Sequence, residues 1–210
     1  MRIIGYWHIW AVNHYYTVIT DQLRILLTSG LYDECEEIRI GFIGNADDKA
    51  LFDKLFTGVY HKLKVRFYST DPSVYEFPTL KLIENDSSDY VGFYFHTKGV
   101  TRPFDPIINH WRSVLNERVL NHWREHMERV ENGYDASSVN FLISPDHFSG
   151  NFWWFRSAYI NRLPRINTID RDNRFHAEQW ICMCADKKIY SPPHIEPGDD
   201  TFKIQYHANH

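Results

Sequence analysis

The first third of the chain alternates short apolar runs with segments whose apolar side chains recur at helical spacing. Residues 2–10 form an apolar run typical of a buried strand, and residues 14–29 carry apolar positions three and four apart until Gly30 ends the pattern. The strand pattern returns at residues 38–44 and again at residues 64–69. Between these two runs, residues 46–63 have helical spacing. This rhythm predicts strands and helices in alternation, with the strands in a parallel sheet.

The rest of the chain continues the alternation with less regular spacing. Residues 75–86 predict a short helix opened near Pro78, and residues 90–95 predict a fourth strand. Asp105 before a proline is typical of a helix N-cap, and apolar positions on one face extend that helix to near Gly133. The remaining expected elements are a strand at residues 138–144, a strand leading into a helix at residues 150–164, and another helix at residues 177–186. Residues 191–210 form a loop-rich tail that we expect to fold back over a ligand-binding site. We therefore expect one α/β domain with a mostly parallel sheet flanked by helices.

Composition narrows the class of protein and its partners. The net charge of −4 predicts no binding to nucleic acid, and no segment has the length of a membrane span or the pattern of a signal peptide. Cys35, Cys182 and Cys184 cannot form a disulfide framework, so we expect a reducing, cytoplasmic location. Aromatic residues make up 16% of the chain, more than we expect a core of this size to need, which suggests exposed rings that bind sugars.

The expected fourth strand ends abruptly in the polar residues HTKG, 96–99. Ligands of open parallel sheets bind at the carboxyl ends of the strands, so these side chains are candidates for a binding site. Lys98 could neutralise a phosphate, His96 could bind a metal or a sugar hydroxyl, and Gly99 would let the backbone approach a ligand closely. The alternative interpretation is a turn with a hydrogen-bonded histidine.

A second candidate segment is HFSGNFWW, residues 147–154. Ser149 and Gly150 permit close approach, and Asn151 offers both a hydrogen-bond donor and an acceptor next to aromatic rings, a combination that suits sugars. The alternative is an aromatic core strand, and we expect Trp153 or Trp154 to be buried in either case.

Other signals in the sequence are weaker. Glu178 lies in the first turn of an expected helix, where stabilisation of the helix dipole alone would explain a carboxylate. His122 and His126 have the spacing of a zinc-binding helix, but the glutamate of a metalloprotease motif is misplaced. The Asp-x-Asp motif at residues 170–172 follows no apolar strand, so we interpret it as accidental.

Five segments in this order resemble the nucleotide-sugar glycosyltransferases of the GT-A fold. They are TSGLYDECEEIRIGFIG, YEFPTL, FHTKG, HFSGNFWW and AEQW, and the resemblance covers nearly the whole chain. It is greatest to the amino-terminal glycosyltransferase domains with which chlorella viruses build capsid glycans. The resemblance implies a GT-A-like (Rossmann-like) α/β fold with a mixed, mostly parallel sheet, formed by residues 1–210 as a single glycosyltransferase domain of a longer protein.

The resemblance also implies where a donor sugar nucleotide would bind. The residues at positions that contact the nucleotide in this family, with Lys98 added for the diphosphate, are His8, Asn13, Tyr15, Glu76, Thr79 and Lys98. The residues that would face the donor sugar are Gly150, Asn151 and Trp153. Glu178 falls where these enzymes place a carboxylate near the anomeric carbon, so we expect it to act as the catalytic base, with Asp146 in reserve.

The expected metal site departs from the family pattern. In the GT-A fold the fourth strand normally ends in Asp-x-Asp, whose carboxylates bind Mn²⁺ or Mg²⁺ on the donor diphosphate, whereas here His96 and Lys98 occupy the position. Either His96 is a metal ligand with His207 of the tail as its partner, or Lys98 performs part of the metal's electrostatic role. We keep Mn²⁺ (or Mg²⁺) as the expected cofactor, because Mn²⁺ accepts an imidazole ligand.

These features together predict an enzyme that transfers a hexose or deoxyhexose, of glucose or rhamnose type, from a UDP-sugar to a hydroxyl of a growing glycan. The acceptor expected from the resemblance is the glycan of a viral capsid glycoprotein, which places the protein in the cytoplasm of a host cell. The alternative from another class is a carbohydrate-binding domain without catalysis, which the dense aromatic residues and the missing strand-end Asp-x-Asp also fit.

Overall fold

The computed structural model describes residues 1–192, and His207 lies outside the described residues. Its main elements are β1 (Ile3–Trp10), α1 (Tyr15–Thr28), α2 (Leu31–Glu34), β2 (Glu37–Ile43), α3 (Ala46–Phe52), β3 (Leu63–Ser69), α4 (Phe77–Glu84), β4 (Val91–His96), α5 (Pro106–Leu115), α6 (Trp123–Glu131), β5 (Ala136–Ser137), β6 (Phe141–Leu142), β7 (His147–Phe148), β8 (Trp153–Arg156), α7 (Ser157–Ile160), α8 (Phe175–Gln179) and β9 (Ile189–Tyr190). No helix in this part of the chain is long and apolar enough to cross a membrane.

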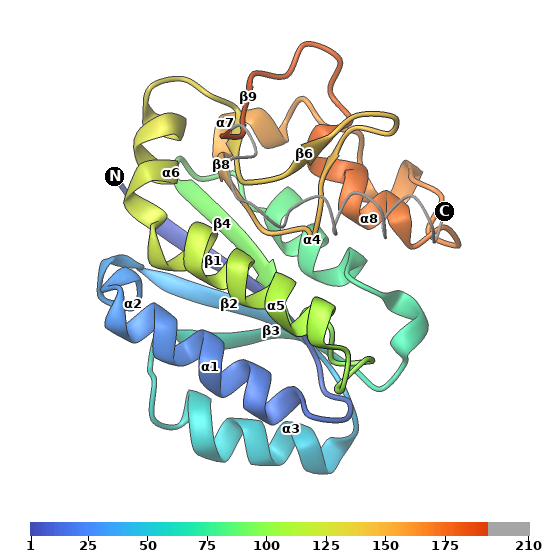
Figure 1. The fold of residues 1–210 in the computed structure, drawn as a ribbon. Coiled ribbons are helices and arrows are strands. Elements are labelled where there is room, and N and C mark those ends of the chain that lie inside the picture. Colours follow the sequence, from blue (N-terminus) through green and yellow to red (C-terminus); the bar gives the residue numbers. More distant parts are fainter. Residues whose placement is uncertain (193–210) are drawn as a thin grey trace.

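The sheet has seven strands in the order β3-β2-β1-β4-β8-β5-β9 (Figure 1). The pairs β3–β2, β2–β1, β1–β4 and β5–β9 are parallel, and β8 alone runs opposite to both of its neighbours. A separate hairpin joins β6 and β7. The predicted fold class is therefore confirmed: the protein has a GT-A-like (Rossmann-like) α/β fold with a mixed, mostly parallel sheet flanked by helices.

Helices cover both faces of the sheet (Figure 1). The side chains of β1 are divided between the cores on these two faces. Trp7 and Ile9 belong to the core cluster that includes α1, α5 and α6, whereas Ile4 and Tyr6 belong to the cluster that includes α4, α7 and the segment 180–184. Side chains of a strand alternate between faces, so a strand buried on both faces must be apolar throughout. This explains the unbroken apolar run at residues 2–10.

The core uses many of the aromatic residues, although Tyr16, Tyr68 and Phe104 are exposed, as the composition led us to expect. Trp7, Trp153, Trp154 and Trp180 are among the largest fully buried side chains. Ring centroids lie 4.8 Å apart both for Phe93 with Trp154 and for Tyr94 with Trp153, one pair on each face of the sheet. A sheet covered on both faces has two cores to fill, and stacked aromatic rings fill them with large apolar surfaces.

Three other predicted elements differ from the structure. The helix expected at residues 177–186 is only the end of the short α8 followed by a 3₁₀ turn, Trp180–Cys182. Residues 138–144 are not one strand, because Asn140 (φ 54°) and Ser144 (φ 68°) adopt left-handed backbone conformations that interrupt extended pairing. The long helix after Asp105 is divided between α5 and α6 by a π-helical turn, Asn116–Asn121. Its start was predicted correctly: the Asp105 carboxylate accepts hydrogen bonds from the N–H groups of Ile107 and Ile108 at 3.0 and 3.2 Å.

Candidate functional site

Polar residues gather where β1 and β4 end side by side. His8 and His96 are opposite each other in the parallel register. Thr97 joins the two strand ends, because its N–H donates to the His8 carbonyl at 3.1 Å and its Oγ1 accepts from the Trp10 N–H at 2.9 Å. Since ligands of open α/β sheets bind at the carboxyl ends of the strands, this edge is the candidate functional site.

The loop after β4 is held in one shape from two sides. Gly99 has φ 80°, and a Cβ at this position would lie 2.4 Å from a methyl carbon of α5, so only glycine fits. On one side, Arg112 Nη1 donates to the Lys98 carbonyl at 2.9 Å. On the other, Asn13 Nδ2 donates to the Val100 carbonyl at 2.9 Å, which connects the loops that follow β1 and β4.

The imidazole of His96 has one nitrogen anchored and one nitrogen free. Nε2 lies 2.9 Å from the Gly150 carbonyl oxygen, and since a carbonyl can only accept, Nε2 carries the proton. Burial lowers the pKa of His96 to about 4, the charge of Lys98 lowers it as well, and the Gly150 carbonyl and Glu178 act in the opposite direction. The ring is therefore neutral near neutral pH, and Nδ1 keeps a lone pair.

Glu76, directly before α4, faces that lone pair. Its Oε2 accepts hydrogen bonds from the Tyr94 hydroxyl and from Asn151 Nδ2, the latter at 2.5 Å. Its Oε1 lies 3.7 Å from Nδ1 of His96. Burial raises the pKa of Tyr94 well above its ordinary value, so the phenol remains a donor. The two donors orient the carboxylate, with the remaining oxygen toward His96.

His8 and Thr79 lie below the surface of the site. The His8 side chain bonds to Thr79 through Nδ1 and Oγ1 at 3.0 Å, and burial lowers the pKa of His8 to about 4. Thr79 is fully buried, and it packs so closely on β2 that a Cβ at Gly41 would lie 2.0 Å from its hydroxyl oxygen. The predicted direct contact of Thr79 with a nucleotide is therefore corrected: no surface is free for it, and the His8–Thr79 bond instead positions α4.

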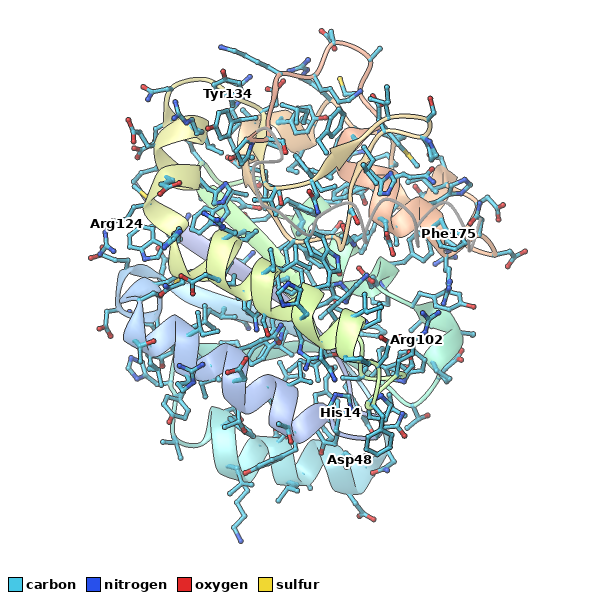
Figure 2. All side chains as sticks on the ribbon, viewed as in Figure 1. His14, Asp48, Arg102, Arg124, Tyr134 and Phe175 are labelled. Atoms are coloured by element: carbon cyan, nitrogen blue, oxygen red, sulfur yellow. The ribbon has the colours of Figure 1, made fainter. Side chains whose placement is uncertain are left out.

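The other residues predicted to contact the nucleotide differ in exposure. Asn13 is exposed beside the loop after β4, whereas Tyr15 is 7% exposed and donates its hydroxyl to Asp48 of α3 at 2.9 Å. Within residues 1–192, the ammonium group of Lys98 makes no hydrogen bond or ion pair. Figure 2 shows that Arg102, His14 and Asp48 also lie toward the edge of the sheet where β1 and β4 end. Lys98 is thus a positive charge available to a ligand.

The residues predicted to face the sugar fall into two groups. Gly150 and Asn151 are also buried, Asn151 fully, so they belong to the site through the contacts with His96 and Glu76 rather than through exposed surface. Trp153 is fully buried, stacks on Tyr94 and donates its indole N–H to Asn151 Oδ1 at 2.7 Å. The prediction that Trp153 touches the donor sugar is corrected for this reason: its ring supports the site from the core.

The two candidate bases have different surroundings. Glu178 lies in the first turn of α8, is partly buried and acts on the pKa values of both Tyr94 and His96, which places its charge near the site. Asp146 is paired with Lys187 at 2.6 Å, and its side chain is 39% exposed. The structure thus distinguishes a carboxylate near the candidate site from one held by a lysine.

Metal binding can be assessed from His96. In the described part of the chain, no group of three or more His, Cys, Asp or Glu side chains is arranged to hold a metal ion. The His96 side chain is suited to act as a metal ligand, because its Nε2–H is anchored on a carbonyl while Nδ1 offers a lone pair, as in metal-binding histidines. The predicted partner His207 lies outside the described residues, so that pairing stays a prediction. His126 of the weak zinc motif bonds through both nitrogens, to Ser137 and Arg118.

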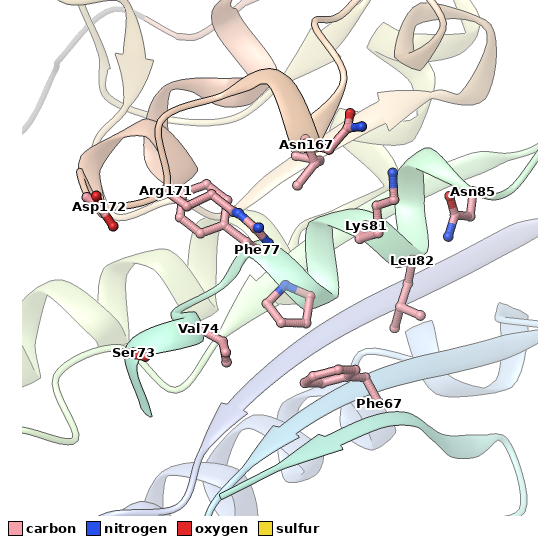
Figure 3. A pocket seen from close by; sticks show the side chains of 12 residues that line it. Phe67, Ser73, Val74, Phe77, Lys81, Leu82, Asn85, Asn167, Arg171 and Asp172 are labelled. Carbon is pink, nitrogen blue, oxygen red and sulfur yellow. The ribbon is translucent and has the colours of Figure 1, made fainter. Parts of the chain in front are cut away.

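A cavity of 620 Å³ lies on the other side of α4 (Figure 3). Phe67, Phe77, Pro78 and Leu82 provide apolar surface, and Asn85, Asn167, Arg171 and Asp172 provide polar groups. The last two belong to the Asp-x-Asp motif that we interpreted as accidental, and it lies in an exposed loop. The cavity therefore combines apolar rings with polar side chains, as sugar-binding sites do.

The sequence did not single out Tyr94, although a signal for it was present. Residues 94 and 96 of a strand share one face, and the rings of Tyr94 and His96 lie 6.4 Å apart. A tyrosine two positions before a strand-end histidine therefore lines the same site.

Three comparisons place the chain among known proteins. A family model described as Domain of unknown function (DUF8361) matches residues 10–194. No curated protein sequence matches the chain. Solved structures that match include 4-diphosphocytidyl-2C-methyl-D-erythritol synthase from Anaerococcus prevotii DSM 20548, with a TM-score of 0.46 and 12% identity, over 100% of this chain and 99% of that one.

Proposed function

The chain belongs to the family described as Domain of unknown function (DUF8361), and we propose that it is a UDP-sugar-dependent glycosyltransferase. The proposed reaction moves a hexose or deoxyhexose, of glucose or rhamnose type, to a hydroxyl of a growing glycan, with viral capsid glycan as the acceptor class. The observation that carries the proposal is the arrangement at the ends of β1 and β4. An available positive charge, Lys98, lies beside an oriented pair, Glu76 and His96, with Glu178 nearby.

Each requirement of sugar transfer has a residue in this arrangement. Lys98 would offset the negative charge that develops on the leaving diphosphate. A divalent cation, when bound, supplies further stabilisation of that charge, and Nδ1 of His96 is the described nitrogen that would hold it. Glu178 would take the proton of the acceptor hydroxyl as the hydroxyl attacks the anomeric carbon. Tyr94 and Asn151 hold the Glu76 carboxylate in place throughout.

The nucleotide specificity tests the proposal directly. We expect UDP to bind more tightly than GDP or CMP, and more tightly with Mn²⁺ than with EDTA. The measurement is isothermal titration calorimetry of the full chain with each nucleotide. Equal binding of the three nucleotides would contradict a UDP-sugar enzyme.

Lys98 should account for a measurable part of UDP affinity. The variant Lys98→Ala removes a positive charge that has no partner within residues 1–192, so UDP binding should weaken by about 1.5–3 kcal/mol, the scale of a hydrogen bond to a charged group. Lys54→Ala, at an exposed lysine of the segment after α3, is the matched control. Unchanged affinity in a folded Lys98→Ala variant would place the diphosphate elsewhere.

A second candidate function, carbohydrate binding without catalysis, is favoured by the cavity beside α4. Its aromatic and polar lining would suit a saccharide whether or not the chain transfers sugars. The UDP titration separates the two candidates, because a protein that only binds carbohydrate has no use for a nucleotide.

A further inference from the structure

The cavity beside α4 is built from three parts of the chain that the fold brings together (Figure 3). Phe67 of the edge strand β3 lies on one side, and the segment 166–172 lies on the other. The outer face of α4 forms the floor, through side chains that recur at helical spacing: Pro78, Lys81, Leu82 and Asn85. The volume of 620 Å³ lies within the range of about 300–1,000 Å³ that small-molecule sites occupy.

Arg171 is the unpaired cation of this cavity. Within residues 1–192 its guanidinium makes no hydrogen bond or ion pair, and Figure 3 shows its side chain extending from the segment 166–172 toward α4. The neighbouring Asp172 lies at the outer end of that segment. The other cation, Lys81, is already neutralised by an ion pair with Glu84. A single negative charge on a ligand would therefore match the free charge of the cavity.

The segment that carries Arg171 is held in one shape from both ends. At its start, the N–H of Ile166 donates to the buried carboxylate of Glu84 at 2.7 Å. Near its end, the Asp170 carbonyl oxygen lies 2.9 Å from Nδ1 of His176 in α8. A binding group on a fixed segment loses less conformational entropy when a ligand binds, so these contacts prepare the guanidinium for a ligand.

The rest of the lining suits the two kinds of surface that a sugar presents. Phe67, Pro78 and Leu82 offer apolar surface to the C–H groups of a sugar ring. Asn85 and Asn167 are exposed, and in the described part of the chain their amide groups make no hydrogen bond. Each amide can therefore both donate to and accept from sugar hydroxyls. The guanidinium adds a position for a negative charge, which a neutral sugar lacks.

We propose that this cavity binds a saccharide that carries a carboxylate, such as a hexuronic acid residue of a glycan. The planar guanidinium of Arg171 can donate two parallel hydrogen bonds to a carboxylate. A phosphate would bring a second negative charge to a cavity that Asp172 also lines, so the geometry favours a ligand with one negative charge. The inference specifies the ligand of the carbohydrate binding suggested above for this cavity, and it holds whether or not the chain transfers sugars.

Methyl β-D-glucuronide and methyl β-D-glucoside are matched probes, because they differ mainly in the carboxylate. NMR titration of the isotope-labelled full chain with each glycoside gives the ratio of their affinities. We expect the glucuronide to bind about five- to tenfold more tightly, a preference between that of an exposed ion pair and that of a charge-assisted hydrogen bond. Arg171→Gln should bring the two affinities together. Arg165→Gln is the matched control that should keep the preference, because Arg165 is exposed and lies outside the cavity lining.

A second variant tests the charge without changing Arg171. Asn85→Asp adds a negative charge to the same cavity, so it should weaken binding of the glucuronide more than binding of the glucoside. Equal affinities of the two glycosides for the wild-type chain, or no binding of either, overturn the inference, as does a preference that survives in Arg171→Gln. Benzoate that binds as tightly as the glucuronide overturns the assignment of a saccharide.

UDP titration of the same chain separates this inference from the proposed function. UDP binding without glucuronide binding would overturn the inference and leave the proposed transferase intact. Glucuronide binding without UDP binding would support the inference and contradict the transferase.

Discussion

Replacing Glu178 by glutamine should lower the rate of sugar transfer by about 10²- to 10⁴-fold, the usual contribution of a general base. Glutamine has nearly the same shape but cannot accept the proton of the acceptor hydroxyl. Glu178 lies in the first turn of α8 and acts electrostatically on Tyr94 and His96. UDP affinity and the free energy of unfolding should change little, because a first-turn carboxylate contributes only about 0.3–1 kcal/mol through the helix dipole.

The measurement is steady-state transfer with the donor selected from UDP-glucose and UDP-rhamnose, beside UDP titration and thermal unfolding. Glu125→Gln is a matched control, since Glu125 is an exposed carboxylate in the first turn of α6. Transfer at near the wild-type rate by Glu178→Gln would make Glu178 structural. Asp146→Asn would then be the next variant, and a loss of rate there would require the ion pair with Lys187 to open during catalysis.

Replacing Trp153 by alanine should destabilise the fold by about 3–5 kcal/mol, the range for large aromatic side chains removed from a core. The indole is fully buried, its ring centroid lies 4.8 Å from that of Tyr94, and its N–H donates to Asn151 at 2.7 Å. The substitution therefore leaves a cavity beneath the site and an amide oxygen without its donor. UDP binding should weaken as well, because Asn151 and Tyr94 both bond to Glu76.

Chemical denaturation, followed by the fluorescence of the remaining tryptophans, measures this loss. Phe104→Ala is the control, because Phe104 is 94% exposed and its removal should change stability by no more than about 0.5 kcal/mol. A small loss of stability together with a large loss of sugar binding would restore the prediction that Trp153 contacts the sugar.

Much of the fold follows from local pattern. The alternation of apolar runs and helical spacing predicted β1, α1, β2, β3 and β4, because burial on both faces of a parallel sheet requires continuous apolar strands. The strand-end position of His96 followed from the same reasoning, since an apolar run that stops at a polar residue marks where the chain leaves the sheet. Asp105 before proline predicted a helix start that the structure confirms. These features depend on neighbours within a few residues.

The site itself depends on residues that are distant in sequence. Glu76, His96 and Gly150 meet because α4 packs on β1 and β2 and because the segment before β8 reaches the end of β4. No spacing rule predicts that the Glu76 carboxylate will face the free nitrogen of His96, or that Trp153 will support Asn151 from the core. Composition counts aromatic rings but does not say which way their faces point. Periodicity reports which side of an element is buried, whereas the partner across the gap is selected by how complete helices and strands pack against one another.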